Sequence, residues 1–138
     1  MKLHIVILTS LTMLPVNFAI SDSATVESLM QSYTAKGAVS PSAEQGKQLW
    51  GKTFKGKGEF AERSCTTCHT ESLTASGKHV KTGKMIKAIS PSVNQARFTS
   101  FKKVEKWFKR NCKWTLGREC NAQEKADLLL YITNTTSF

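Results

Sequence analysis

The chain has 138 residues, 40% of them hydrophobic, and a formal net charge of +10. This length allows one small domain with a modest core, and the basic excess favours acidic partners. No DNA-binding motif accompanies the charge, so we expect no nucleic-acid partner. The longest apolar run is too short to span a bilayer comfortably, so we also expect no membrane span.

The N-terminus has the pattern of an export signal. Lys2 supplies a positive end, residues 3–14 form a mostly apolar core, and small residues at Ala19 and Ser21 suit cleavage. We therefore expect residues 1–21 to be a signal peptide and the mature protein to be periplasmic. An uncleaved amphipathic anchor is the alternative.

The next segment, residues 22–41, is predicted to be an N-terminal extension with a short helix that packs only on the surface. Its apolar residues repeat at helical spacing: Val26, Leu29, Met30 and Tyr33. Residues 42–138 then form the main domain, which we expect to be all-α because no convincing alternating pattern predicts a strand. Ser42 is placed to cap its first helix, with Gln45 three residues on.

The stretch Cys65-Thr66-Thr67-Cys68-His69 has the spacing for covalent attachment of a c-type haem. Two thioether bonds would hold the porphyrin, and the His69 imidazole would reach the iron. A thioredoxin-like motif would need a buried strand before it, which the sequence does not suggest. A zinc site completed by Cys112 and Cys120 stays open, although their spacing is longer than usual.

Residues 70–100 lack clear periodicity, which is typical of a segment that wraps a ligand. We expect this loop to cover the lower edge and the propionates of the haem, with a short helix around residues 84–89. Arg97 is a candidate partner for a propionate; a surface salt bridge is the alternative.

The ligand on the other side of the iron decides the function, because a strong ligand gives an electron carrier and a weak one a site for small molecules. The candidates are Met85, His79, Asn94, Asn111 and, more remotely, Met30. We expect Met85 to be a packing residue and His79 to be exposed among lysines.

The helix predicted for residues 101–111, capped by Thr99 or Ser100, carries an apolar stripe that ends at Asn111. The stripe consists of Val104, Trp107, Phe108 and Asn111. A buried, unpaired amide is costly, and a ferric iron would accept its oxygen, so Trp107 and Phe108 become candidates for the distal wall. The alternative is that Asn111 ends the helix in the left-handed conformation.

Two cysteines remain after haem attachment, and an oxidising compartment would permit Cys112 and Cys120 to pair. Trp114, inside the ring that they would close, either shields the site or is exposed. Asn121 with Glu124 predicts the cap of the last helix, whose apolar face includes Leu128 and Tyr131.

Trp107 to Cys112, followed by Gly117-Arg118-Glu119-Cys120, resembles the oxygen-binding class I cytochromes c called sphaeroides haem proteins (SHP). The resemblance covers roughly residues 40 to 134. It implies a small helical domain wrapped around one covalently bound haem c, held by Cys65, Cys68 and His69.

The resemblance further implies that Asn111 is the distal ligand and that Cys112 and Cys120 form a neighbouring disulfide. The asparagine would leave when the iron is reduced, and oxygen or nitric oxide would then bind. A dihaem cytochrome c is the implied electron donor, and the basic charge suggests that its surface is acidic. The fold would bring Gly46 and Trp50 against Leu128 and Tyr131.

Two other functions stay open. One is a plain electron-transfer cytochrome c with Met85 as the sixth ligand, and the other is a haem-free zinc-binding or structural module. The sequence does not decide whether the protein is an enzyme.

Overall fold

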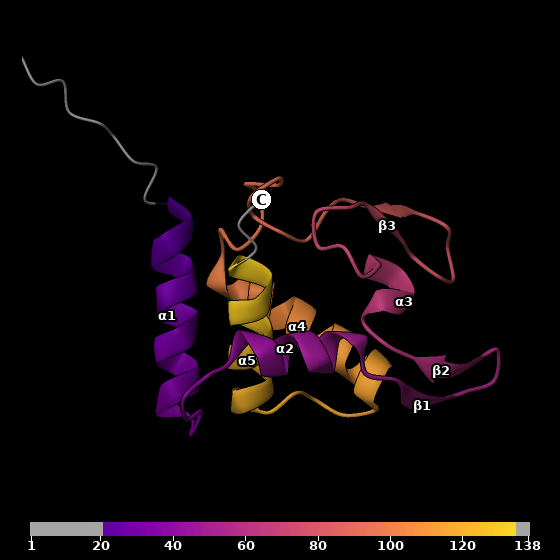
Figure 1. Ribbon diagram of the computed structural model, residues 1–138, viewed down its shortest axis with the longest axis horizontal. Coiled ribbons are helices and arrows are strands. Elements are labelled where there is room, and N and C mark those ends of the chain that lie inside the picture. The colour runs from indigo at the N-terminus through magenta and orange to yellow at the C-terminus, as the bar shows by residue number, and fades with distance from the viewer. Residues whose placement is uncertain (1–20, 135–138) are drawn as a thin grey trace, which may run out of the picture.

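A computed structural model describes residues 21–134, in which five helices and two short hairpins form the structure. The helices are α1 (Ser21–Ala35), α2 (Ala43–Gly51), α3 (Thr66–His69), α4 (Phe101–Leu116) and α5 (Ala122–Thr133), and the strands are β1 (Phe54–Lys57), β2 (Phe60–Arg63), β3 (Gly77–Lys78) and β4 (Met85–Ile86). Figure 1 shows α1, α2, α4 and α5 gathered together, with α3 and both hairpins at the other end of the molecule.

The all-α class is confirmed, because the strands are short and form only two antiparallel pairs, β1 with β2 and β3 with β4. The strands themselves were not predicted. A helix was expected around residues 84–89, and this was wrong, since Met85 pairs with Lys78 across a hairpin. The signal peptide prediction lies almost wholly outside the described residues. None of the helices in the described part of the chain is long and apolar enough to cross a membrane.

The contact between α2 and α5 organises the core. A Cβ added at Gly46 would lie 2.1 Å from the carbonyl oxygen of Asp127, so only glycine allows the two helices to approach this closely. One turn further along α2, the ring of Trp50 packs edge-on against Tyr131 with centroids 6.2 Å apart. The expected glycine and aromatic contact with Tyr131 is therefore present.

The expectation that the first helix would pack only on the surface was wrong. Leu29 and Tyr33 of α1 are fully buried at 0% exposure, and α1 packs against both α4 and α5. The Tyr33 hydroxyl donates a hydrogen bond to Glu105 of α4 at 2.5 Å. The first helix is therefore part of the core.

Helix capping follows the sequence closely. The Ser42 hydroxyl accepts from the Gln45 amide at the start of α2, and the Ser100 hydroxyl accepts from the Lys103 amide at the start of α4. Asn121 and Glu124 form a reciprocal capping box before α5. All three elements begin where these polar residues satisfy otherwise unpaired amide groups.

Helix α4 is longer than predicted. It runs through Asn111 to Leu116 and ends at Gly117, whose φ of 77° is in the left-handed region that glycine adopts without strain. Asn111 is therefore inside the helix, and the alternative that it ends the helix was wrong. The residues after Asn111 are ordinary helix formers, and Gly117 is the stop signal.

Candidate haem-binding site

The short helix α3 presents the two cysteines and the histidine of the motif on one turn. The amides of Cys68 and His69 both donate to the carbonyl of Cys65, at 3.3 and 3.1 Å. Before the turn, the Ser64 amide donates to the hydroxyl of Thr67 at 2.9 Å. Cys65 and Cys68 are half-buried free thiols, so the turn holds two unpaired sulfurs immediately before the imidazole.

The surroundings of the motif favour neutral side chains. Burial, with a smaller contribution from Cys68, raises the pKa of the Cys65 thiol to about 12. Burial, followed by the positive charge of Arg97, lowers the pKa of His69 to about 4. The imidazole is therefore neutral at physiological pH, which is the form that binds metals.

Trp50 of α2 packs against the imidazole of His69, a contact that was not predicted from the sequence. Its ring centroid lies 5.5 Å from that of His69, and its indole Nε1 donates to the carbonyl of Thr70 at 3.1 Å. The α2–α5 core is thus joined directly to α3. The sequence gives no local signal for this contact, because Trp50 and His69 come from different elements.

Gly77 was also missed, although it sets the distance between the β3–β4 hairpin and α3. A Cβ at this position would lie 2.0 Å from the Cys68 carbonyl oxygen and 3.0 Å from the His69 Cα. Only glycine lets the hairpin backbone touch the motif.

Arg97 lies close enough to influence His69, but it also supports the 70–100 loop. Its Nε donates to the Ala88 carbonyl at 2.9 Å, and its Nη2 donates to that of Lys87. Asn94 donates to the same Ala88 carbonyl, so this candidate ligand is engaged in the loop. Burial lowers the pKa of Arg97, and an acidic partner for this guanidinium remains a prediction.

Asn111 lies on the exposed side of α4, not in the core. The expectation of an amide buried by the protein was therefore wrong. Trp107, one turn earlier, is also 44% exposed, with the Arg110 guanidinium 5.0 Å from its ring centroid. Phe108 faces the other way, edge-on to Tyr33 at 6.3 Å. Within residues 21–134, the side-chain amide of Asn111 has no hydrogen-bond partner.

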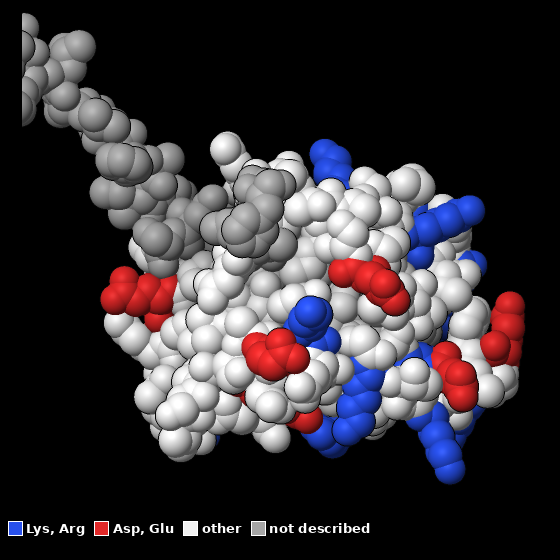
Figure 2. All heavy atoms as spheres, viewed as in Figure 1, with Lys and Arg blue, Asp and Glu red and all other residues white. Residues whose placement is uncertain are grey.

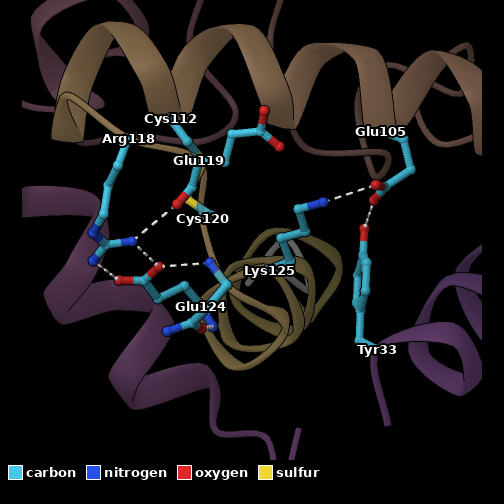
Figure 3. Close-up of a disulfide and its surroundings, with 9 residues drawn as sticks. Tyr33, Glu105, Cys112, Arg118, Glu119, Cys120, Glu124 and Lys125 are labelled. Carbon is cyan, nitrogen blue, oxygen red and sulfur yellow. Dashed lines mark hydrogen bonds and ion pairs between the residues drawn. A yellow bond between two sulfur atoms is a disulfide. The ribbon is translucent and has the colours of Figure 1, made fainter. Parts of the chain in front are cut away.

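The residue after Asn111 is fixed by a disulfide. Cys112 and Cys120 are bonded, with Cα atoms 5.5 Å apart and both residues buried. Figure 3 shows the bond between α4 and the start of α5. The predicted pairing is therefore present, and the two sulfurs are not available as ligands. The zinc alternative needed Cys112 and Cys120 as ligands, so the disulfide contradicts it. The described part of the chain also contains no group of three or more His, Cys, Asp or Glu able to hold a metal.

Charged residues hold the disulfide loop against α4 and α5. Arg118 donates through both terminal nitrogens to the Glu124 carboxylate at 2.7 Å, as Figure 3 shows. Glu119 lies 3.1 Å from the Lys113 ammonium and 3.6 Å from that of Lys109. These side chains join the two helices beside the sulfur bridge.

Trp114, inside the same loop, is half-buried and joins α4 to the β1–β2 hairpin. Its ring lies 6.2 Å from that of Phe60, and the Arg63 guanidinium lies 4.9 Å from it. Arg63 also donates to the Trp114 carbonyl at 2.9 Å. The hairpin that precedes the cysteine motif is therefore attached to the helix that carries Asn111.

Of the other three candidate ligands, Met30 lies on α1 and packs against the hydrophobic core. The remaining two lie on the β3–β4 hairpin. Met85 is 70% exposed. His79 is exposed as expected, and its Nδ1 is 3.2 Å from the Thr82 amide. Both residues thus belong to an element that packs on α3, whereas Asn111 lies on α4.

The chemistry of these residues fits a c-type haem. Two free, half-buried thiols stand at thioether spacing beside a neutral imidazole. Among the described residues, Cys65 and Cys68 form no disulfide and belong to no cluster of three or more metal-binding side chains.

Comparison with known proteins identifies the family. Residues 36–132 match the family described as Domain of unknown function (DUF1924). The chain belongs to this family. It is 39% identical over 114 residues to the cytochrome c-type protein SHP of Cereibacter sphaeroides, covering 83% of this chain and 87% of that protein. It is 36% identical over 127 residues to cytochrome c'' of Methylophilus methylotrophus, covering 86% and 85%.

Solved structures of the same relatives share the fold of this DUF1924 protein. Oxidised SHP, described as an oxygen-binding cytochrome c, has a TM-score of 0.71 and covers 78% of this chain and 95% of that one. Oxidised cytochrome c'' has a TM-score of 0.73 at 34% identity and covers 84% and 98%. The resemblance to SHP is confirmed, and the fold is a small all-α cytochrome c fold. Its cofactor is one covalently bound haem c, which Cys65, Cys68 and His69 are placed to hold.

Proposed function

We propose that this protein is a periplasmic monohaem cytochrome c in which His69 and Asn111 bind the ferric iron from opposite sides. Asn111 leaves on reduction, and the ferrous haem then binds or reduces a small diatomic molecule such as oxygen or nitric oxide. Another cytochrome c, for which a dihaem protein is the candidate, supplies the electron.

The observation that carries this proposal is the availability of the Asn111 amide. It is exposed on α4, has no hydrogen-bond partner among the described residues, and directly precedes the buried Cys112. A side chain in this position can move without breaking a hydrogen bond to the described residues, while the neighbouring disulfide holds its backbone.

The chemistry of the amide supports a redox-dependent ligand. A neutral amide oxygen is a hard donor, which suits ferric iron better than the softer ferrous iron. Asn111 therefore binds weakly, and one electron is enough to loosen it. The haem supplies the redox and ligand-binding chemistry, and the protein controls access to it.

The relatives support the same function. SHP is described as an oxygen-binding cytochrome c, and the solution structure of cytochrome c'' is described in terms of haem-ligand detachment. In this protein, loss of the Asn111 ligand would leave a coordination position of the haem iron open to an external ligand such as oxygen.

Substitution of Asn111 tests the proposal against the electron-carrier alternative. The ferric protein with Asn111→Ala should lose its protein-derived sixth ligand and shift toward the high-spin state, whereas Met85→Leu should leave the spectrum unchanged. Electron paramagnetic resonance of both ferric variants measures this. A spin state that changes in Met85→Leu and not in Asn111→Ala would make the protein a methionine-ligated carrier.

A further inference from the structure

The positive charge of the chain is concentrated in one long segment. Between Glu71 and Glu105 the sequence contains seven Lys or Arg residues and no Asp or Glu. Four of the seven flank Met85 on the β3–β4 hairpin and its ends: Lys78, Lys81, Lys84 and Lys87. We call these four lysines and Met85 the hairpin surface.

The lysines of the hairpin surface are exposed, and none forms an ion pair within residues 21–134. Three lysines elsewhere are paired, since Lys109 and Lys113 meet Glu119, and Lys125 meets Glu105. On the face shown in Figure 2, basic and acidic side chains are interspersed. No ion pair within the described residues neutralises the four lysines of the hairpin surface, so their charge can act on an approaching anion.

The hairpin lies directly on the helix that binds the haem. The backbone of Gly77 contacts Cys68 and His69 so closely that no Cβ fits there. Figure 1 shows β3 beside α3, at the end of the molecule opposite α1. A partner on this surface would therefore be separated from the motif by little more than the hairpin itself.

The centre of the surface is apolar. Met85 is 70% exposed, and a flexible methionine adapts to varied partner surfaces. At the turn of the hairpin, Lys81 lies 5.8 Å from the ring centroid of Phe60. A hollow of about 390 Å³ lies between the two hairpins, and its lining is mostly charged: Lys57, Glu59, Phe60, Arg63, Val80 and Lys81. Met85 is therefore the apolar point of this surface, and charged residues surround it. An apolar centre within a charged rim is the usual arrangement of a protein interface.

We propose that the hairpin surface is the docking site for an acidic redox protein that delivers the electron to the haem. This inference rests on the proposed function, since it locates the donor's binding site on the chain. Charge complementarity favours a protein with exposed carboxylates. A single exposed methionine offers little apolar area for insertion into a lipid surface, which favours a protein partner over a membrane.

The test uses the haem-loaded protein and a defined anionic reductant, Fe(II)–EDTA. The reductant gives one electron to the ferric haem and becomes Fe(III)–EDTA, and stopped-flow absorbance follows the reaction. The variant Lys78→Glu/Lys81→Glu/Lys84→Glu is compared with Lys102→Glu/Lys103→Glu/Lys106→Glu, which makes the same charge change at the start of α4. The control lysines lie in the first turns of α4, where Glu105 contacts Tyr33 of α1. The β1–β2 hairpin contacts the other end of α4, through Phe60 and Trp114.

At low ionic strength we expect the hairpin variant to react about fivefold or more slowly than the control variant, because local charge steers the anion. High salt should remove the difference, and the cationic reductant hexaammineruthenium(II) should react faster with the hairpin variant than with the control. Equal rates for the two variants would overturn the proposal. A second result would also overturn it: equal reduction rates for the two variants, together with weaker binding of the hairpin variant than of the control to phosphatidylglycerol vesicles. That result would assign the surface to a membrane.

A second readout separates this inference from the proposed function. Carbon monoxide binding to the ferrous protein should be the same in the wild type and in both lysine variants. If the ferrous protein does not bind carbon monoxide in any form, the proposed function fails while the rate comparison still tests the docking site.

Discussion

At the scale of single residues, the site depends on contacts made by side chains from distant parts of the chain. Trp50 packs against the ring of His69 and donates a hydrogen bond to the Thr70 carbonyl. The side-chain amide of Asn111, in contrast, has no hydrogen-bond partner among the described residues, and the next residue, Cys112, is held by the disulfide. The proximal ligand is thus held firmly, and the proposed distal ligand is tethered only through its backbone. This asymmetry makes detachment on the Asn111 side the easier event.

Trp50→Phe tests the support of the proximal side. It keeps an aromatic ring next to His69 but removes the 3.1 Å hydrogen bond to the Thr70 carbonyl, so unfolding should become easier by about 1–3 kcal/mol. Urea unfolding of the haem-loaded protein measures this. An unchanged midpoint would mean that the indole nitrogen does not stabilise the motif.

The sequence predicted residues whose role is set by local spacing. Cys65, Cys68 and His69 are recognisable from five consecutive positions. Asn121 is recognisable as a helix cap from Glu124, three positions later. Trp50 and Gly77 could not be recognised as parts of the site, because their contacts join segments that are distant in the sequence. The exposure of Asn111 was missed for a related reason: helical phase gives a shared stripe, but not what covers it.

At the scale of elements, three helices meet at Glu105. The carboxylate of this α4 residue accepts from Tyr33 of α1 and lies 2.7 Å from the Lys125 ammonium of α5, as Figure 3 shows. The helical spacing of apolar residues in α1 predicts a helix, but it does not show which other helices cover that face. The buried Tyr33 hydroxyl requires a partner, and Glu105 supplies it from a helix 72 positions away.

Glu105→Gln should destabilise the protein by about 1–3 kcal/mol at neutral pH, since it leaves Lys125 without its carboxylate. Burial alone would raise the pKa of Glu105, but the hydrogen bonds from Lys125 and Tyr33 outweigh it and hold the pKa below its usual value. The stabilisation is therefore present above the unfolded pKa and is lost as the pH falls through the lower folded value.

The difference in unfolding free energy between the wild type and Glu105→Gln should accordingly shrink in acid. Urea titrations at neutral pH and at a series of acidic pH values measure it. A difference that is constant over this range would show that the charge of Glu105 does not contribute. Tyr33→Phe is the matched control, because it removes one hydrogen bond and leaves the carboxylate paired with Lys125.

In the whole molecule, the hydrophobic core lies at one end and the haem-attachment motif at the other (Figure 1). The buried core consists mainly of α1, α2, α4 and α5, while α3 and the two hairpins form the other end (Figure 1). The disulfide closes a loop of eight positions between α4 and α5, and a chain-entropy argument assigns such a loop roughly 2.5 kcal/mol of stabilisation. The helix that carries Asn111 is therefore anchored at both ends, by Glu105 and by Cys112.

This arrangement predicts that the helices keep their positions while the Asn111 side chain detaches on reduction. An anaerobic reductive titration of the wild-type protein, followed by resonance Raman spectroscopy without added ligand, tests it most directly. We expect a six-coordinate ferric haem to become a five-coordinate, high-spin ferrous haem that then binds nitric oxide. A ferrous haem that stays six-coordinate and low-spin, and is unaffected by nitric oxide, would contradict the account.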